Sequence, residues 1–164
     1  MVMYNDDMAA TKVKEPGVGD KAPDFSAVDE TGRPWSLKGL KGRVIVLYFY
    51  PKDNTPGCTV EACDFRDRFD AFAKKKVVVL GVSPDPAKAH ASFKAKHGLP
   101  FPLLVDEDKT ICHAYGVWKE KSLYGRKFMG VERSTFVIGP DGKLSRVERK
   151  VSVAGHAQEV LEAV

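Results

Sequence analysis

The feature that most constrains the fold is the uninterrupted apolar and aromatic run from Val44 to Tyr50. A strand with one face in water alternates apolar and polar residues, whereas a continuous run is typical of a central strand covered on both faces. The runs from Val77 to Val82 and from Pro102 to Val105 have the same character. The chain is therefore predicted to form a sheet of buried strands with helices on both sides.

Helical patterns and two hairpins surround these strands. The helices are expected at Thr59 to Lys75, Pro86 to His97, Lys109 to Tyr115, and from Gly155 to the C-terminus. Glycine-bearing turns predict antiparallel hairpins from Phe25 to Leu37 and from Ser134 to Glu148. Alternating strands and helices followed by a hairpin and a last helix predict an α/β, thioredoxin-like fold, with a central mixed β-sheet flanked by helices and an N-terminal β-hairpin.

Length and composition predict one globular domain. The chain has 164 residues, and we expect residues 1–16 to be a flexible N-terminal tail and residues 17–164 to be the thioredoxin-like domain. Its 26 basic and 22 acidic residues are scattered along the sequence, which argues against a nucleic-acid partner. No apolar stretch approaches the ~18 residues of a membrane span, and residues 1–10 lack an export-signal pattern. We therefore expect a cytoplasmic protein with no membrane partner.

The chain has three cysteines, Cys58, Cys63 and Cys112. They are too few for a secreted disulfide scaffold, and an odd number cannot all pair within the chain. In a reducing compartment such cysteines are buried fillers, metal ligands or redox groups. A structural zinc site is disfavoured because the paired C-x-x-C spacing is missing. We expect no metal and no cofactor.

Cys58 is placed where a thiol becomes reactive. The segment from Pro51 to Thr59 follows the carboxyl end of the central strand and opens the longest helix, which is the usual ligand crevice of an open α/β sheet. Thr55 suits the N-cap and Pro56 the first helical position. Cys58 then lies in the first turn, where unpaired N–H groups and the helix dipole favour a thiolate.

A plainer interpretation of Cys58 has to be weighed against this one. Cys58, Ala62, Phe65, Phe69 and Phe72 recur at helical spacing and form one face that turns toward the sheet. Cys58 is therefore also consistent with being the first filler of an apolar stripe. Periodicity alone leaves the two interpretations equal, and the first-turn position at a strand end favours the reactive thiol.

Cys63 lies on another flank of the same predicted helix, beside charged residues. An exposed thiol five residues from a nucleophilic one suggests a resolving partner. Five residues of helix separate two Cα atoms by about 8.6 Å, whereas a disulfide needs them within about 7 Å. A bond between Cys58 and Cys63 therefore requires the first helical turns to unwind.

The residues around Cys58 resemble a known active site. The run from Pro51 to Cys58, a proline, three residues, a threonine, two residues and a cysteine, is similar to the peroxiredoxin motif. The fuller segment from Thr55 to Cys63 resembles the peroxiredoxin Q branch, also called bacterioferritin comigratory protein. The resemblance continues at 106–108, 115–118 and 133–136 and covers the chain from about Gly19 to its end.

This resemblance implies a thioredoxin-dependent peroxidase that reduces hydrogen peroxide and organic hydroperoxides to water and alcohols. Cys58 would be the peroxidatic cysteine that becomes a sulfenic acid, and Cys63 would resolve it as an intramolecular disulfide. The Thr55 hydroxyl would lie between the thiolate and the peroxide, and Pro51 would shield the pocket from water. Arg133 would lie beside Cys58 and favour its thiolate. Thioredoxin or a similar dithiol would regenerate a monomeric enzyme.

Plainer roles compete for these residues. Arg133 is also consistent with a surface pair to Glu132 or Glu148, and Thr55 with a simple helix cap. Glu61 is expected either to orient Arg133 through a charge-assisted hydrogen bond or to be an ordinary surface residue. Cys112 is expected to be a buried bystander, and none of the four histidines is expected to be a general base.

Two other functions fit the same sequence less well. Thioredoxin-type redox pairs are three residues apart, whereas Cys58 and Cys63 are five apart, which disfavours a disulfide oxidoreductase. A binding or holdase module on the same scaffold would use the cysteines only for packing.

Overall fold

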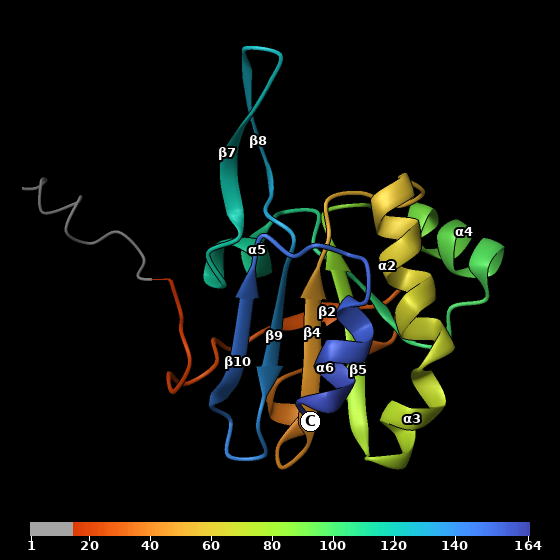
Figure 1. Cartoon of the computed structure of the whole chain (residues 1–164), viewed down its shortest axis with the longest axis vertical. Coiled ribbons are helices and arrows are strands. Elements are labelled where there is room, and N and C mark those ends of the chain that lie inside the picture. Colours follow the sequence, from red (N-terminus) through yellow and green to blue (C-terminus); the bar gives the residue numbers. More distant parts are fainter. Residues whose placement is uncertain (1–14) are drawn as a thin grey trace, which may run out of the picture.

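The computed structural model describes residues 15–164 and has the predicted α/β architecture (Figure 1). Its main sheet has five strands in the order β10-β9-β4-β5-β6. The continuous apolar run forms the central strand β4 (Val44–Phe49), which pairs in parallel with β5 (Val77–Ser83) and antiparallel with β9 (Ser134–Ile138). The edge strands are β6 (Leu103–Val105), parallel to β5, and β10 (Leu144–Arg149), antiparallel to β9.

Alternate residues of β4 enter two separate cores, as the period of a strand requires. Val46 and Tyr48 point into a core formed with α2 (Pro56–Asp67), α3 (Phe69–Lys74), α4 (Ala87–His97) and α6 (His156–Glu162). Ile45 and Leu47 point to the opposite face, which is covered by α5 (Thr110–Ala114) and the N-terminal segment. The sheet is therefore buried on both sides.

The predicted helix from Thr59 to Lys75 is wrong in one respect, because it is two helices. Arg68 separates α2 from α3 with φ −109° and ψ 8°, outside the helical region. Its side chain pairs with Asp64 and donates to Gln158 Oε1 of α6 at 2.9 Å. Asp64 also accepts the N–H of Ala157 at 3.1 Å. These contacts with α6 override the local helical pattern, as tertiary packing commonly does.

Both expected hairpins are present. The N-terminal one pairs β2 (Ser26–Val28) with β3 (Pro34–Ser36) and leads into a short 3-10 helix, η1 (Lys38–Leu40). The C-terminal one pairs β9 with β10. The remaining predicted strands and helices also occupy their expected places, with ends that differ by one to three residues.

A third hairpin was not predicted. Strands β7 (Trp118–Leu123) and β8 (Arg126–Val131) form a separate two-stranded sheet. It rises from the end of the main sheet at which α2 begins (Figure 1). Tyr124 and Gly125 have φ values of 52° and 77°, the pair of positive angles that a two-residue hairpin turn requires. Tyrosine is not a usual turn residue, and the charged strand residues show no alternation, so the pattern was missed.

Most of the predicted N-terminal tail, residues 1–14, lies outside the described residues. Glu15, at its end, pairs with Lys119 and Arg149, and the Pro16 carbonyl accepts a bond from Arg149 at 3.2 Å. Within the described part of the chain, no helix is both long enough and apolar enough to cross a membrane.

Candidate active site

The site is built where β4 ends and α2 begins. Thr55 is the N-cap of α2 and Pro56 its first residue, as predicted. Cys58 therefore lies in the first turn, with only 2% of its surface exposed. The Thr55 hydroxyl makes no capping bond to the helix and instead donates to the Lys52 carbonyl at 2.9 Å.

Arg133 reaches this cysteine from the neighbouring strand. Phe49 pairs with Ser134 in the antiparallel register of β4 and β9, so the residue before β9 lies beside the end of β4. The Nη2 atom of Arg133 donates to Sγ of Cys58 at 3.1 Å, and its Nη1 atom donates to Oε1 of Glu61 at 2.6 Å. A Cβ atom on Gly57 would lie 3.3 Å from Nη2, so the glycine makes room for this approach.

The charges around the sulfur favour an anion. Burial lowers the pKa of Arg133, but the negative charges of Glu61 and Cys58 and the bonds to both more than offset it and raise the pKa, so the guanidinium stays charged. Lys121 of β7 is a second nearby cation, and burial together with the charge of Arg133 lowers its pKa. Neighbouring cations and first-turn N–H groups stabilise a thiolate.

Glu61 has an unusual environment for a carboxyl group. It is 1% exposed, and within residues 15–164 its Oε2 atom has no hydrogen-bond partner. Burial raises the pKa of Glu61 to about 7, because the charge and hydrogen bond of Arg133 offset only part of the desolvation. The carboxyl group of Glu61, which accepts the hydrogen bond of Arg133, thus titrates close to neutral pH.

Cys63 lies on the same intact helix, half-buried, and both cysteines are free thiols. Helical geometry places their Cα atoms about 8.6 Å apart, beyond disulfide range. Pro51 and Thr55 lie on the loop that precedes α2 and are both half-buried. The structure therefore brings Arg133 to Cys58, with Thr55 at the start of the same helix and Pro51 on the loop before it, and leaves Cys63 on that helix but out of bonding reach.

Cys112 is buried, as predicted, on the opposite face of the sheet from Cys58. Burial, followed by the negative charge of Asp106, raises its pKa strongly and keeps it a neutral thiol. This position separates Cys112 from the chemistry at Cys58.

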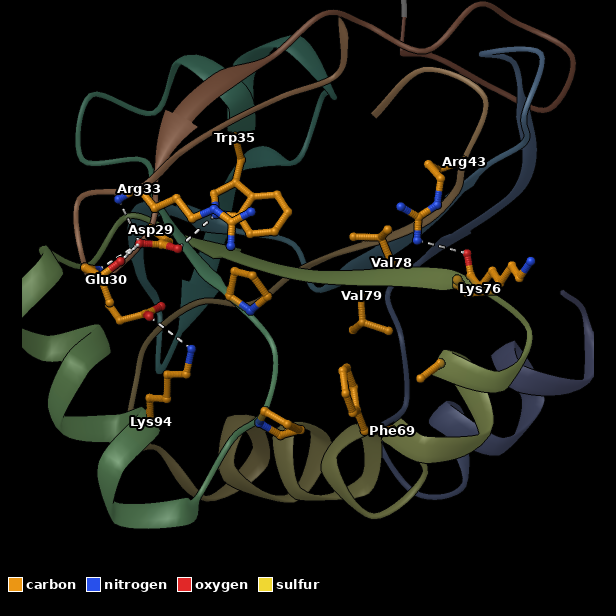
Figure 2. Close-up of a pocket in the computed structure, with 15 residues that line it drawn as sticks. Asp29, Glu30, Arg33, Trp35, Arg43, Phe69, Lys76, Val78, Val79 and Lys94 are labelled. Atoms are coloured by element: carbon orange, nitrogen blue, oxygen red, sulfur yellow. Dashed lines mark hydrogen bonds and ion pairs between the residues drawn. The ribbon is translucent and has the colours of Figure 1, made fainter. Parts of the chain in front are cut away.

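A cavity of about 550 Å³ lies away from this site, at the start of β5 (Figure 2). Polar groups in its lining are paired with one another: Asp29 accepts from Trp35 Nε1 at 2.9 Å, and Glu30 binds Lys94 at 2.9 Å. None of its lining residues is a cysteine. We therefore place the chemistry at Cys58 and not in this cavity.

Sequence reasoning missed one polar group beside the site. Asp53 and His90 are buried against each other although they are 37 residues apart in sequence, and no motif joins them. Asp53, Asp85 and His90 lie close enough to hold a metal ion, as do Glu148, His156 and Glu159. In the first group the close atoms already hydrogen-bond to protein partners, so we interpret it as a polar network.

Comparison with known proteins identifies the family of this chain. The model of the AhpC/TSA family matches residues 18–147, and the chain belongs to this family. Within it, the chain falls in the peroxiredoxin branch called Bcp or peroxiredoxin Q, so the resemblance found in the sequence is confirmed.

Two curated relatives illustrate the similarity. The putative peroxiredoxin bcp of Coxiella burnetii is 53% identical over 144 residues, which are 88% of this chain and 95% of the relative. Peroxiredoxin Bcp of Bacillus subtilis is 50% identical over 147 residues, which are 90% and 94% of the two chains.

Solved structures confirm the thioredoxin-like fold. The bacterioferritin comigratory protein of Xanthomonas campestris, studied for its alkyl peroxide reduction activity, has a TM-score of 0.83 at 42% identity and covers 90% of this chain and 94% of its own. A cysteine-to-serine variant of Xylella fastidiosa PrxQ has a TM-score of 0.86 at 40% identity, covering 92% and 96%.

Proposed function

We propose that this peroxiredoxin is a thiol-dependent peroxidase that reduces hydrogen peroxide and organic hydroperoxides through Cys58. One observation carries the proposal: a buried thiol in the first turn of α2 accepts a hydrogen bond from the charged Arg133 at 3.1 Å. A packing cysteine does not need a guanidinium aimed at its sulfur, whereas a neighbouring cation stabilises a nucleophilic thiolate.

In the first step the Cys58 thiolate attacks one oxygen of the peroxide. An S–O bond forms, the O–O bond breaks, and the other oxygen leaves as hydroxide or alkoxide and takes up a proton. Negative charge grows on that leaving oxygen, and Arg133 and the unpaired N–H groups at the start of α2 are preorganised donors for it. Cys58 is left as a sulfenic acid.

The loop before α2 suits a peroxide that still carries a proton. The hydrogen of the Thr55 hydroxyl is donated to the Lys52 carbonyl, so the oxygen keeps lone pairs for a donor. A hydroperoxide O–H is such a donor, and its bond to Thr55 would aim the oxygen at Sγ of Cys58. Pro51, half-buried, brings no N–H to the loop and limits the access of water.

In the second step Cys63 attacks the sulfur of the sulfenic acid. An S–S bond forms, the S–O bond breaks, and water leaves. The first turns of α2 must unwind for this step, and two local features lower its cost, although Glu61, buried and bonded to Arg133, lies within the unwinding stretch. The helix has no side-chain capping bond, a deficit of about 1 kcal/mol. Its buried apolar residues before Cys63 are the small Cys58 and Ala62, whereas the large Phe65 lies beyond it.

In the third step a dithiol such as thioredoxin reduces the disulfide and restores both thiols. Both cysteines belong to one chain, so we propose a monomer as the working unit and residues 17–164 as its catalytic domain. Free thiols at Cys58, Cys63 and Cys112 suit a reducing compartment, and we place the protein in the cytoplasm.

Mass spectrometry of the thiol state after one equivalent of peroxide tests this function. We expect a Cys58–Cys63 disulfide in the wild type, no fast reaction in Cys58→Ser, and a sulfenic acid that accumulates in Cys63→Ser. Cys112→Ser serves as the matched control and should behave as the wild type. Retained turnover in Cys58→Ser would end the proposal, and thioredoxin-linked cycling in Cys63→Ser would assign resolution to another thiol.

A further inference from the structure

A buried polar network that the three chemical steps do not use lies next to the active-site loop. His90 of α4 is fully buried; its Nδ1 atom is 2.7 Å from Oδ2 of Asp53, and its Nε2 atom is 2.8 Å from the Leu104 carbonyl oxygen. The second carboxylate oxygen of Asp53 accepts the Tyr50 hydroxyl at 2.6 Å. The network therefore joins the loop after β4 to α4 and β6.

The contacts define the charge of the His90 ring. Each ring nitrogen faces an acceptor, a carboxylate on one side and a carbonyl on the other, and the ring donates to both only as an imidazolium with a hydrogen on each nitrogen. The titratable groups that face it are Asp53, Tyr50 and Asp85. Burial lowers the pKa of His90, but the bond and charge of Asp53, the Leu104 carbonyl and the charge of Asp85 more than offset it and raise the pKa.

Asp53 is held by its backbone as well as by its side chain. Its N–H donates to Oδ2 of Asp85 at 2.6 Å, and Asp85 in turn accepts the Ser83 hydroxyl at 2.9 Å. The next residue, Asn54, has a φ of 62°, a left-handed conformation that asparagine adopts more readily than most residues. Lys52, the residue before Asp53, accepts the hydrogen bond of the Thr55 hydroxyl at its carbonyl oxygen.

We propose that Asp53 and His90 are positioning residues of the peroxidase, whose buried ion pair holds the loop 51–55 in the conformation that presents Thr55 and the start of α2 to the hydroperoxide. The inference rests on the proposed function of Cys58. It separates two tasks: Arg133 sets the charge on the sulfur, and the Asp53–His90 pair sets the geometry of the loop. A buried ion pair works as a unit, because removal of one partner leaves the other charge uncompensated.

Two rates measured on the full-length reduced chain distinguish these tasks. One is the rate at which peroxide oxidises Cys58, which needs the loop, and the other is the rate at which iodoacetamide alkylates Cys58, which needs the thiolate and access to it but no bond to Thr55. In His90→Asn and in Asp53→Asn we expect the peroxide rate to fall roughly ten- to a hundredfold, the usual cost of a small misplacement, with the alkylation rate not reduced. The double variant should be no slower than the slower single variant.

His113→Asn is the matched control, because His113 is exposed on α5, and it should leave both rates unchanged. A folded His90→Asn protein with the wild-type peroxide rate would overturn the inference, and so would an equal loss of both rates. Nitrogen NMR of the wild type needs no variant: we expect both ring nitrogens of His90 to carry hydrogens at neutral pH, and a neutral ring would overturn the inference. Peroxide that fails to oxidise wild-type Cys58 would refute the proposed function itself, a result visible before any variant is made.

Discussion

Nη2 of Arg133 lies 3.1 Å from Sγ of Cys58, although the two residues are 75 positions apart in the sequence. The antiparallel pairing of β9 with β4 makes this contact, and Glu61 on the next turn of α2 holds the other end of the guanidinium. The thiol and its cation are thus fixed by two elements of the main fold.

Replacement of Arg133 by Gln should reduce the rate of Cys58 oxidation by about 10²- to 10³-fold, the cost of losing one preorganised donor to a developing anion. The ultraviolet absorbance of the thiolate at neutral pH should fall in parallel. Because the single variant leaves the buried Glu61 without its partner, the measurement is best made in the background of Glu61→Gln. Arg126→Gln, at the exposed tip of the β7–β8 hairpin, is the control. An unchanged oxidation rate would remove the role assigned to Arg133.

Gly57→Ala should change activity and stability in opposite directions. The new Cβ atom would lie 3.3 Å from Nη2 of Arg133 and push the guanidinium away from the sulfur. We expect a roughly three- to tenfold slower reaction with peroxide, while the helix gains up to about 1 kcal/mol from the better helix former. Gly17→Ala, whose Cβ atom has no contact closer than 3.9 Å, is the control. Stopped-flow oxidation and urea unfolding measure the two effects, and a wild-type oxidation rate would contradict the first.

Glu61 should make the stability of the protein depend on pH. Its pKa is about 7 in the folded state against an ordinary value of 4.5, so the folded state binds the proton more tightly than the unfolded state. The contribution of Glu61 to the free energy of unfolding should therefore be greatest below pH 4.5 and should decline as the pH rises to about 7. Relative to Glu61→Gln, the decline should reach on the order of 3 kcal/mol. Urea unfolding of both proteins across this range measures it, and parallel curves would show that Glu61 ionises normally.

Hydrogen exchange should report the unwinding that the disulfide requires. In the oxidised protein we expect the amides of residues 59–63 to exchange much faster than in the reduced protein, because their helical hydrogen bonds must open. Amides of α4, which does not carry either cysteine, serve as the internal reference. Slow exchange at 59–63 in a protein with a proven Cys58–Cys63 bond would be incompatible with the helical geometry described here.

The sheet and the position of Cys58 could be predicted because each depends on a local signal. A continuous apolar run indicates a strand buried on both faces, and Thr55 with Pro56 indicates where the following helix begins. The role of Arg133 followed only from the family resemblance, because the contact depends on strand pairing between distant segments.

The remaining features depend on tertiary contacts that leave no local pattern. The break between α2 and α3 follows from the bonds of Asp64 and Arg68 to α6. The ion pair of Asp53 with His90 joins residues from a loop and a helix with no spacing rule between them. The hairpin of β7 and β8 is a separate two-stranded sheet whose outer residues are exposed, and at its base Trp118 and Val131 join the core beside the main sheet.

Asp64 also sets a limit on how far α2 can open. Its carboxylate accepts the first free N–H of α6, so the helix is tied to the body of the protein at the residue directly after Cys63. If α2 unwinds from Thr55, the unwound stretch includes both cysteines and ends at the bond of Asp64 to α6, where Phe65 is still buried. The protein can therefore open and close a short stretch of chain in every turnover while Phe65 and the aromatic core around it stay packed.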